Sequence, residues 1–399
     1  TNYFNPRNAE VFQQEMSRSI EGIGATLQLD NEVTKIMSIV PGGPAFKSKL
    51  VNAGDRIIAV AQGVDGEFED IVGWRIDNAV SKIKGPKGTT VRLKIIPVGQ
   101  DMSSKPVIIT LVREKVILAD QSAKKTVKTV QSDGKPYKIG IIDVPGFYAD
   151  WEAARAGDKN YKSTTRDVRL LIDTLKNIDK VDAIVVDLRA NGGGSLPEAI
   201  DLTGLFIDKG PVVQVREYNK EVSVNSDKDP GAVWTGPLGV MIDRLSASAS
   251  EIFAGAIQDY GRGVVMGTQT YGKGTVQRVI SLNDMLDSSI LQRMMSAIAA
   301  TKNKTKPTST PDKNSSTVTI VDKNGVPQLG QLNLTMGKFY RINGSSTQHK
   351  GVVPDFSFPS IYPLDKIGED TEPSALPFDV IQPSNYQSVA NLTDIKANL

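Results

Sequence analysis

The chain has 399 residues, enough for two or three domains, and 47 basic side chains against 45 acidic ones give a net charge of +2. This balance leaves no basic excess for a nucleic-acid partner, and no apolar run of about twenty residues predicts a transmembrane segment. Cysteine is absent and His349 is the single histidine, which excludes thiol catalysis, disulfide bonds and cysteine-ligated zinc and disfavours a histidine-ligated zinc hydrolase. A Ser-His-Asp triad would have to use His349, so a hydrolase of this sequence is expected to use another base.

Residues 1–19 are the first predicted element. Apolar residues from Val11 to Ile20 fall near helical spacing. We expect the end of a longer N-terminal helical region, truncated before Thr1.

Residues 20–113 predict a small β-rich domain. Glycine and proline turns break the segment into short alternating runs, and one helix is expected near Val72–Lys84. The predicted strands include Thr34–Ile39, Arg56–Val60 and Val91–Ile96.

Residues 114–360 alternate strands and helices, which is typical of α/β packing. The continuous apolar run Ala183–Leu188 predicts a buried strand. Apolar stripes predict helices over Thr164–Ile178, Pro197–Ile207 and Ala249–Tyr260.

Residues 283–330 interrupt this pattern. Met285–Ile298 is compatible with a helix, whereas Thr301–Ser316 is rich in Lys, Thr, Ser and Pro and predicts a mobile insertion. Residues 361–399 contain several prolines and are expected to form a loosely folded C-terminal extension.

A glycine-rich turn precedes the predicted strand Thr26–Leu29. It exposes backbone N–H groups that suit a peptide carboxylate, although the same glycines could serve only to make a turn. Its residues are Gly22, Ile23, Gly24 and Ala25. The ordered sequences PGGPA and AGDRI follow, and the combination resembles a PDZ domain.

Ser248 follows the apolar strand Gly239–Ile242 and begins a predicted helix. Ser248-x-x-Glu251 is a capping box, so a structural role is sufficient to explain this serine. A serine at a strand-to-helix turn is also an accessible nucleophile, and the amide of Ala249 at the helix start suits an oxyanion.

Lys273 lies between two glycines and leads into the apparent strand Thr275–Ile280. Such a lysine is usually a solvated turn residue, and it becomes a base when burial removes its charge. Gln277 lies on the same strand face and is positioned to orient it.

The same segment nearly matches a phosphate-binding P-loop. Gly274 stands where the motif needs Ser or Thr, and a strand follows where the motif needs a helix. An NTPase is therefore disfavoured.

Three consecutive glycines separate the predicted strand Ala183–Leu188 from the next helix. This stretch, DLRANGGGS, runs from Asp187 to Ser195 and is compatible with a flexible turn. It also lets the backbone amides of the three glycines approach a substrate carbonyl closely.

The sequences SASASEIFAGAIQDYGR, TYGKGTVQ, DLRANGGG and STQHKGVVPD resemble the carboxy-terminal processing (tail-specific) protease family. The closing ALPFDVIQPSNY resembles its bacterial periplasmic branch. The resemblance implies a mixed α/β protease core with an inserted or preceding PDZ domain, and further regions before Thr1 and after Leu399.

The family resemblance also implies the chemistry. Ser248 would be the nucleophile, Lys273 the general base and Gln277 its orienting partner, with the amides of Ala249 and Gly193, or a glycine beside it, as the oxyanion hole. No metal or cofactor would be required.

The resemblance further implies periplasmic degradation or processing of proteins with apolar C-termini. The amides from Ile23 to Ala25 would hold the tail carboxylate, and an adaptor or regulatory protein would be a further partner. A catalytically inactive PDZ scaffold is the main alternative, and a hydratase-like acyl-transfer enzyme would leave the PDZ segment unexplained.

Overall fold

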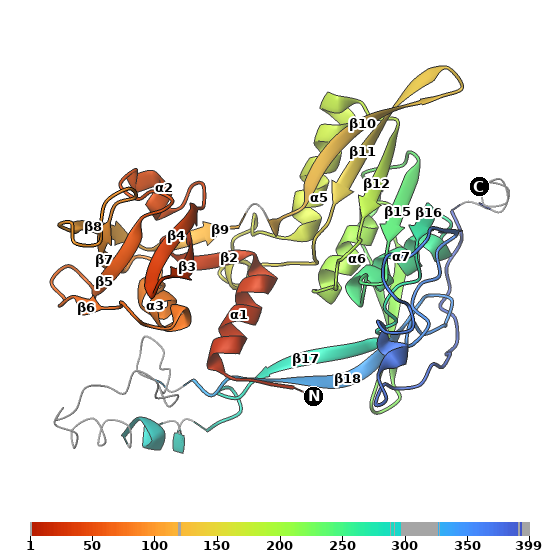
Figure 1. Ribbon diagram of the computed structural model, residues 1–399. Helices are drawn as coiled ribbons and strands as arrows, with labels where there is room; N and C mark the ends of the chain where they lie inside the picture. The colour runs from red at the N-terminus through yellow and green to blue at the C-terminus, as the bar shows by residue number, and fades with distance from the viewer. Residues whose placement is uncertain are drawn as a thin grey trace. The chain divides into compact units, whose positions relative to one another are not determined.

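The computed structural model describes residues 2–118, 121–287, 289–290, 292–296, 326, 328–389 and 392, which divide into two compact units. The smaller unit holds residues 18–118, and the larger unit holds the other described residues (Figure 1). The predicted mobile insertion, Thr301–Ser316, lies outside the described residues. Residues 289–290 and 292–296, within the helix predicted over Met285–Ile298, are helical.

The smaller unit is rich in strands, as the sequence predicts. The predicted helix begins only at Ile76, because Gly73 adopts a φ of 75° and turns the chain ahead of it. The unit also extends past residue 113, because β9 (Glu114–Ile117) pairs with β2 (Ser19–Gly22). Its antiparallel sheet has the order β3 (Ala25–Asp30), β4 (Val33–Ile39), β5 (Arg56–Gln62), β7 (Thr90–Ile96) and β8 (Val107–Val112), with β6 (Glu69–Asp70) beside β5 and the helices α2 (Pro44–Ser48) and α3 (Ile76–Ile83).

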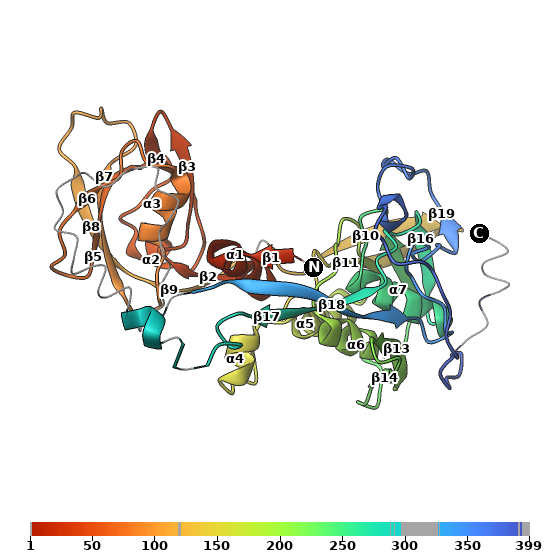
Figure 2. The same ribbon diagram turned by 90° about the horizontal axis from the view of Figure 1, so that it is seen from below.

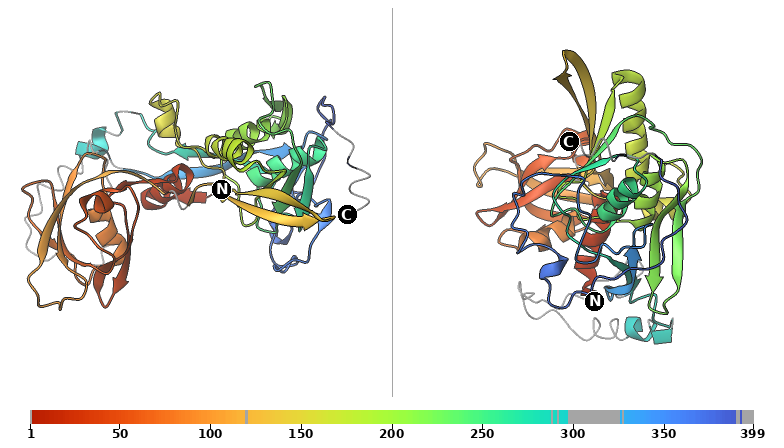
Figure 3. Two further views of the ribbon diagram at one scale, coloured as in Figure 1. Left: turned by 90° about the horizontal axis from the view of Figure 1, so that it is seen from above. Right: turned by 90° about the vertical axis from the view of Figure 1, so that its right-hand side faces the viewer.

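The larger unit contains a six-stranded mixed sheet. Its first two strands form an antiparallel hairpin that projects beyond the others (Figure 3), and the remaining neighbours pair in parallel. The order is β10 (Lys124–Ser132), β11 (Lys135–Asp143), β12 (Ala183–Asp187), β15 (Leu238–Ile242), β16 (Val264–Gly267) and β19 (Phe356–Ser357).

Helices pack against this sheet through one hydrophobic core. Every second residue of β15 is buried, so one face of the sheet meets the helices, with Val240 and Phe253 fully buried. All three predicted helices form. The helices that contribute to this core are α5 (Thr164–Thr174, continued by a π-helix over Leu175–Asp179), α6 (Leu196–Gly204) and α7 (Ala249–Asp259), whereas α4 (Trp151–Arg155) has no buried residue.

A second sheet of five antiparallel strands completes the larger unit, and its two long strands β17 and β18 lie side by side (Figure 2). The N-terminal segment forms the expected helix, α1 (Pro6–Ser17), and also a strand that the sequence pattern does not predict. This strand, β1 (Asn2–Phe4), pairs with β18 (Gln331–Tyr340), which also contacts β17 (Thr275–Ser281) and β13 (Gly210–Glu217), itself followed by β14 (Val222–Asp227).

Among the residues that the structure describes, no helix combines the length and apolar character that crossing a bilayer requires.

Candidate active site

Three loops carry the predicted catalytic residues, and the topology explains why they meet. They follow the carboxyl ends of β12, β15 and β16, which are adjacent parallel strands. The carboxyl ends of such strands lie at one edge of the sheet, which is where α/β proteins commonly bind ligands. The loop 188–195, the loop 243–248 and the loop 268–274 therefore converge.

Ser248 is half-buried and immediately precedes α7. Its backbone adopts φ 56° and ψ −112°, a region that non-glycine residues rarely occupy, at a cost of about 1–3 kcal/mol. Asn191 holds this turn in place. Its carbonyl oxygen accepts hydrogen bonds from the Ala247 N–H at 3.0 Å and the Ser250 hydroxyl at 2.9 Å.

Gly193 lies directly against the serine. A Cβ at this position would be 2.8 Å from the Ser248 Cβ and 3.0 Å from the amide nitrogen of Ala249, so a side chain there would clash. Its φ of 102° also requires glycine. The Gly193 N–H donates to Asn191 Oδ1 at 2.9 Å, whereas the first-turn N–H of Ala249 has no acceptor within its own helix.

Glu251 joins the serine segment to the lysine segment. Its Oε2 accepts hydrogen bonds from the Ser248 N–H at 2.7 Å and the Lys273 N–H at 3.0 Å. Its Oε1 accepts from the Thr270 hydroxyl at 2.6 Å and the Gly272 N–H at 2.7 Å. One carboxylate oxygen thus bonds to the backbones of both predicted catalytic residues.

Lys273 is half-buried, and its ammonium forms no hydrogen bond or ion pair with any residue that the structure describes. The side chain of Gln277 is exposed, and its Oε1 accepts a hydrogen bond from Asn333 Nδ2 at 3.1 Å. The two predicted partners therefore occur on one segment without a hydrogen bond between them.

His349 lies next to the lysine loop, which its sequence position does not suggest. Its backbone N–H donates to the carbonyl oxygen of Gly272 at 2.9 Å. Its Nε2 is buried and has no hydrogen-bond partner among the described residues. The ring is therefore not bonded through Nε2 to the serine hydroxyl, as a triad base would be.

No local sequence pattern indicates that Glu251 bridges the serine and lysine segments. The capping box Ser248-x-x-Glu251 correctly predicts the hydrogen bond that the Ser248 N–H donates to Glu251. The other three donors come from residues 270–273 and give no local signal. The sequence also gave no specific indication of Asn191, whose side chain is fully buried and donates to the Val144 carbonyl at 2.7 Å.

Complete burial raises the pKa of Glu251 to about 7, although the four hydrogen bonds oppose this shift. Between pH 4.5, the ordinary pKa of this group, and about pH 7, the folded chain therefore keeps a proton on Glu251 that the unfolded chain releases. The contribution of this proton to stability is fully present below pH 4.5 and is lost as the pH rises through about 7. The ionised form, in contrast, is the one that accepts all four donors.

Replacing Glu251 with glutamine is expected to lower kcat by at least about tenfold, because an amide NH₂ would face two donors where an oxygen now accepts. Wild-type kcat should also fall as the pH drops below about 7, with no loss of stability from this group. Measurements of kcat and Tm at pH 6 and pH 8 check both expectations.

Glu198 provides a matched control. It is also buried, is the third residue of α6 after the N-cap Ser195, as Glu251 is of α7 after Ser248, and accepts the Thr165 N–H at 2.8 Å. Glu198→Gln should lower Tm comparably and leave kcat near wild type. Equal loss of kcat in both variants would show that Glu251 acts only through stability.

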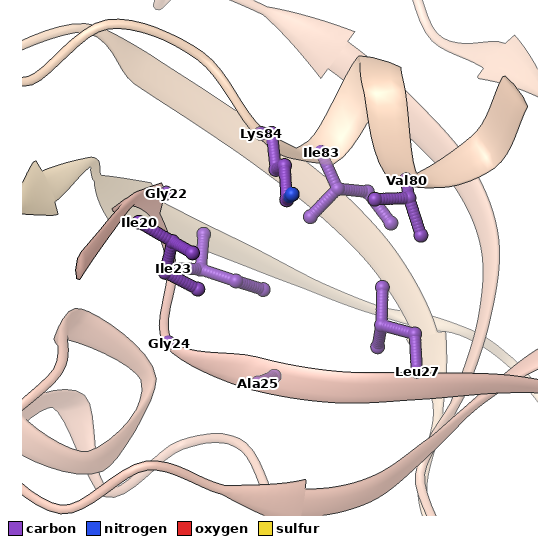
Figure 4. Close-up of a pocket in the computed structure, with 9 residues that line it drawn as sticks. All are labelled: Ile20, Gly22, Ile23, Gly24, Ala25, Leu27, Val80, Ile83 and Lys84. Atoms are coloured by element: carbon purple, nitrogen blue, oxygen red, sulfur yellow. The ribbon is translucent and has the colours of Figure 1, made fainter. Parts of the chain in front are cut away.

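The peptide-binding residues predicted in the smaller unit line a cavity of about 120 Å³ between β3 and α3 (Figure 4). This volume is on the scale of one aliphatic side chain. Its lining is apolar apart from Lys84 at the end of α3. The lining residues are Ile20, Gly22, Ile23, Gly24, Ala25, Leu27, Val80, Ile83 and Lys84.

The strand beside this cavity has an open edge. Among the described strands β3 pairs only with β4, so it lies at the border of its sheet. The Gly24 carbonyl accepts from the Val40 N–H at 2.9 Å, and antiparallel alternation therefore turns the backbone groups of Ala25 away from β4. An extended peptide can add to this edge and place its last side chain in the cavity.

Comparison with known proteins gives the family. Residues 138–358 match the family described as Peptidase family S41, and residues 13–96 match the PDZ domain. A tail-specific protease from Haemophilus influenzae is 43% identical over 395 residues, which cover 99% of this chain and 48% of that protein. A carboxy-terminal-processing protease from Bartonella bacilliformis is 32% identical over 289 residues, covering 71% of this chain and 59% of that protein.

A solved structure of the PDZ domain of a carboxy-terminal protease from Vibrio cholerae in complex with peptide is 48% identical. The match covers 25% of this chain and 97% of that chain, with a TM-score of 0.23. The chain spans about half the length of the curated relatives that it matches. On the family matches and the two related sequences, the chain belongs to peptidase family S41, among the carboxy-terminal processing and tail-specific proteases, and carries a PDZ domain.

Proposed function

We propose that the chain is a serine endopeptidase with a Ser248–Lys273 dyad that recognises the C-terminal tails of proteins and degrades or processes them. The observation that carries the proposal is the Glu251 carboxylate, whose Oε2 bonds to the backbone N–H of both dyad residues. The adjacent Gly193 brings its backbone against the serine, where a side chain would clash.

The reaction is acyl transfer. Neutral Lys273 takes the proton of the Ser248 hydroxyl as the oxygen attacks the scissile carbonyl carbon. When the C–N bond breaks, the lysine returns this proton to the departing amine. A water molecule then attacks the acyl-serine ester, with Lys273 again accepting a proton, and frees the new carboxylate and the serine.

The oxyanion of each tetrahedral intermediate needs N–H donors beside Ser248. The first-turn N–H of Ala249 is well suited, because it lies at the positive end of a helix dipole. The N–H of Gly193 can contribute once it leaves Asn191 Oδ1, its present acceptor. Gln277 would orient Lys273 if the Gln277 Oε1 accepted a hydrogen bond from the lysine ammonium in place of the one from Asn333.

The PDZ domain would select the substrate. The apolar cavity, which Lys84 helps to line, would take the terminal side chain, and the amides from Ile23 to Ala25 would hold the terminal carboxylate. We further propose a periplasmic location and an adaptor or regulatory partner, as the sequence resemblance implies.

An unstructured protein with an apolar C-terminus and a free carboxylate is expected to be cleaved. The same protein with an amidated C-terminus should show a KM raised by about tenfold, because one charge-assisted contact is lost. Cleavage followed by gel and mass spectrometry measures both. Equal KM values would exclude the PDZ domain as the reader of the tail.

The alternative is a catalytically inactive scaffold that binds tails through its PDZ domain. It predicts binding of the carboxylate form in preference to the amide with no cleavage of either. Cleavage by the purified wild-type chain excludes this alternative.

A further inference from the structure

An open strand edge begins two residues after the candidate base. In the described part of the chain β17 pairs with β18 alone, so the other edge of β17 carries no neighbouring strand. The strand begins at Thr275, just after Lys273 in the chain, and lies alongside β18 (Figure 2). Because β17 follows Lys273 directly in the chain, its open edge begins beside the candidate active site.

The direction of the backbone groups on β17 follows from its register. Residues of an antiparallel strand alternate between those bonded to the partner and those whose N–H and C=O point away from it. The Leu282 N–H donates to the Gly330 carbonyl at 3.0 Å, one step beyond the Ser281–Gln331 pair. Leu282 therefore faces β18, and Ser281 and Val279 face the open edge.

The hydrogen bonds at the other end of β17 indicate the same alternation of residues that face β18 and residues that face the open edge. The Gly274 carbonyl accepts from the Phe339 N–H at 2.8 Å, one step beyond the Thr275–Lys338 pair. Gly274 thus faces β18 and Thr275 faces away. The register shift between Val276 and Gln277 skips a residue of β18, so the alternation continues unbroken along β17.

We infer that the substrate segment around the scissile bond adds to this edge as an extended strand, bonded to the backbones of Thr275, Gln277, Val279 and Ser281. The inference rests on the proposed function and names a binding surface for it. Backbone pairing reads no side chains. The chain would therefore tolerate varied sequence at the cleavage point, and selectivity would come from the tail.

Val279→Pro tests the inference. Proline removes the N–H that faces the open edge and leaves the ladder with β18 intact, which is the strand position that tolerates proline. We expect kcat/KM for an unstructured protein substrate to fall by at least about tenfold. Turnover of p-nitrophenyl acetate, which needs no strand pairing, should stay near wild type.

Val224→Pro is the matched control. Val224 is an exposed valine on β14, at the opposite edge of the same sheet. The Glu217 N–H bonds to the Glu221 carbonyl at 3.0 Å, so alternation turns the Val224 backbone outward as well. This variant, which leaves β17 unchanged, should cleave protein at the wild-type rate.

The outcomes separate the two proposals. Protein cleavage at the wild-type rate by Val279→Pro would overturn the strand inference alone. A wild-type chain inactive toward both substrates would overturn the proposed function. If Val279→Pro loses ester turnover as well, N-methylation of successive substrate amides decides with the wild-type enzyme: losses at every second position support the pairing, and a flat profile refutes it.

Discussion

Replacing Ser248 with alanine is expected to lower peptide-bond hydrolysis by at least about a thousandfold while the chain stays folded. The variant keeps the backbone N–H that bonds to Glu251 and loses only the hydroxyl. Alanine and serine tolerate the observed φ of 56° about equally, so the substitution adds no new backbone strain. Any lost capping interaction amounts to about 1 kcal/mol.

Steady-state cleavage of an unstructured protein, with Tm measured on the same preparations, checks this expectation. The Tm should shift by only a few degrees, because about 1 kcal/mol is a small change for a domain of this size. Retained turnover in the pure variant would remove Ser248 from the mechanism.

Lys273→Arg is expected to be as inactive as Lys273→Ala, with at least about a thousandfold loss in kcat. Arginine keeps the positive charge and much of the length, but its guanidinium stays protonated and cannot accept a proton from the serine. The backbone N–H that reaches Glu251 is unchanged in both variants. Single-turnover rates with a peptide substrate measure the acylation step directly.

His349→Ala is the control for this prediction. It removes the single histidine, whose backbone contacts Gly272, and tests whether the ring serves as the base. We expect turnover within about threefold of wild type and an unchanged need for Lys273. An active Lys273→Arg variant together with an inactive, folded His349→Ala variant would reverse the assignment of the base.

Local patterns in the sequence predict much of the fold. The alternation of Val91–Ile96 produces β7, and the apolar stripe over Thr164–Ile178 produces α5 and its π-helical continuation. Each signal lies within the element itself. The pairing of β1 with β18 joins segments more than three hundred residues apart, and nothing in Asn2–Phe4 specifies that partner.

In the candidate site, too, local sequence predicts some features, and contacts between distant segments determine the others. The motifs identify Ser248, Lys273 and the glycine turn, and the order of the parallel strands brings them together. The bridge made by Glu251 depends on where residues 270–273 fold, so its sequence position indicates only a helix cap. Asn333, which bonds to Gln277, likewise comes from a distant strand.

The measurement that tests most directly whether Ser248 is a lysine-activated nucleophile is the position of a covalent adduct. The wild-type chain is treated with a fluorophosphonate, digested and analysed by tandem mass spectrometry. We expect the phosphonyl group on Ser248, formed at least about a thousandfold more slowly in Lys273→Ala. An adduct on another residue of an active chain, or one formed equally fast without the lysine, would contradict the Ser248–Lys273 dyad.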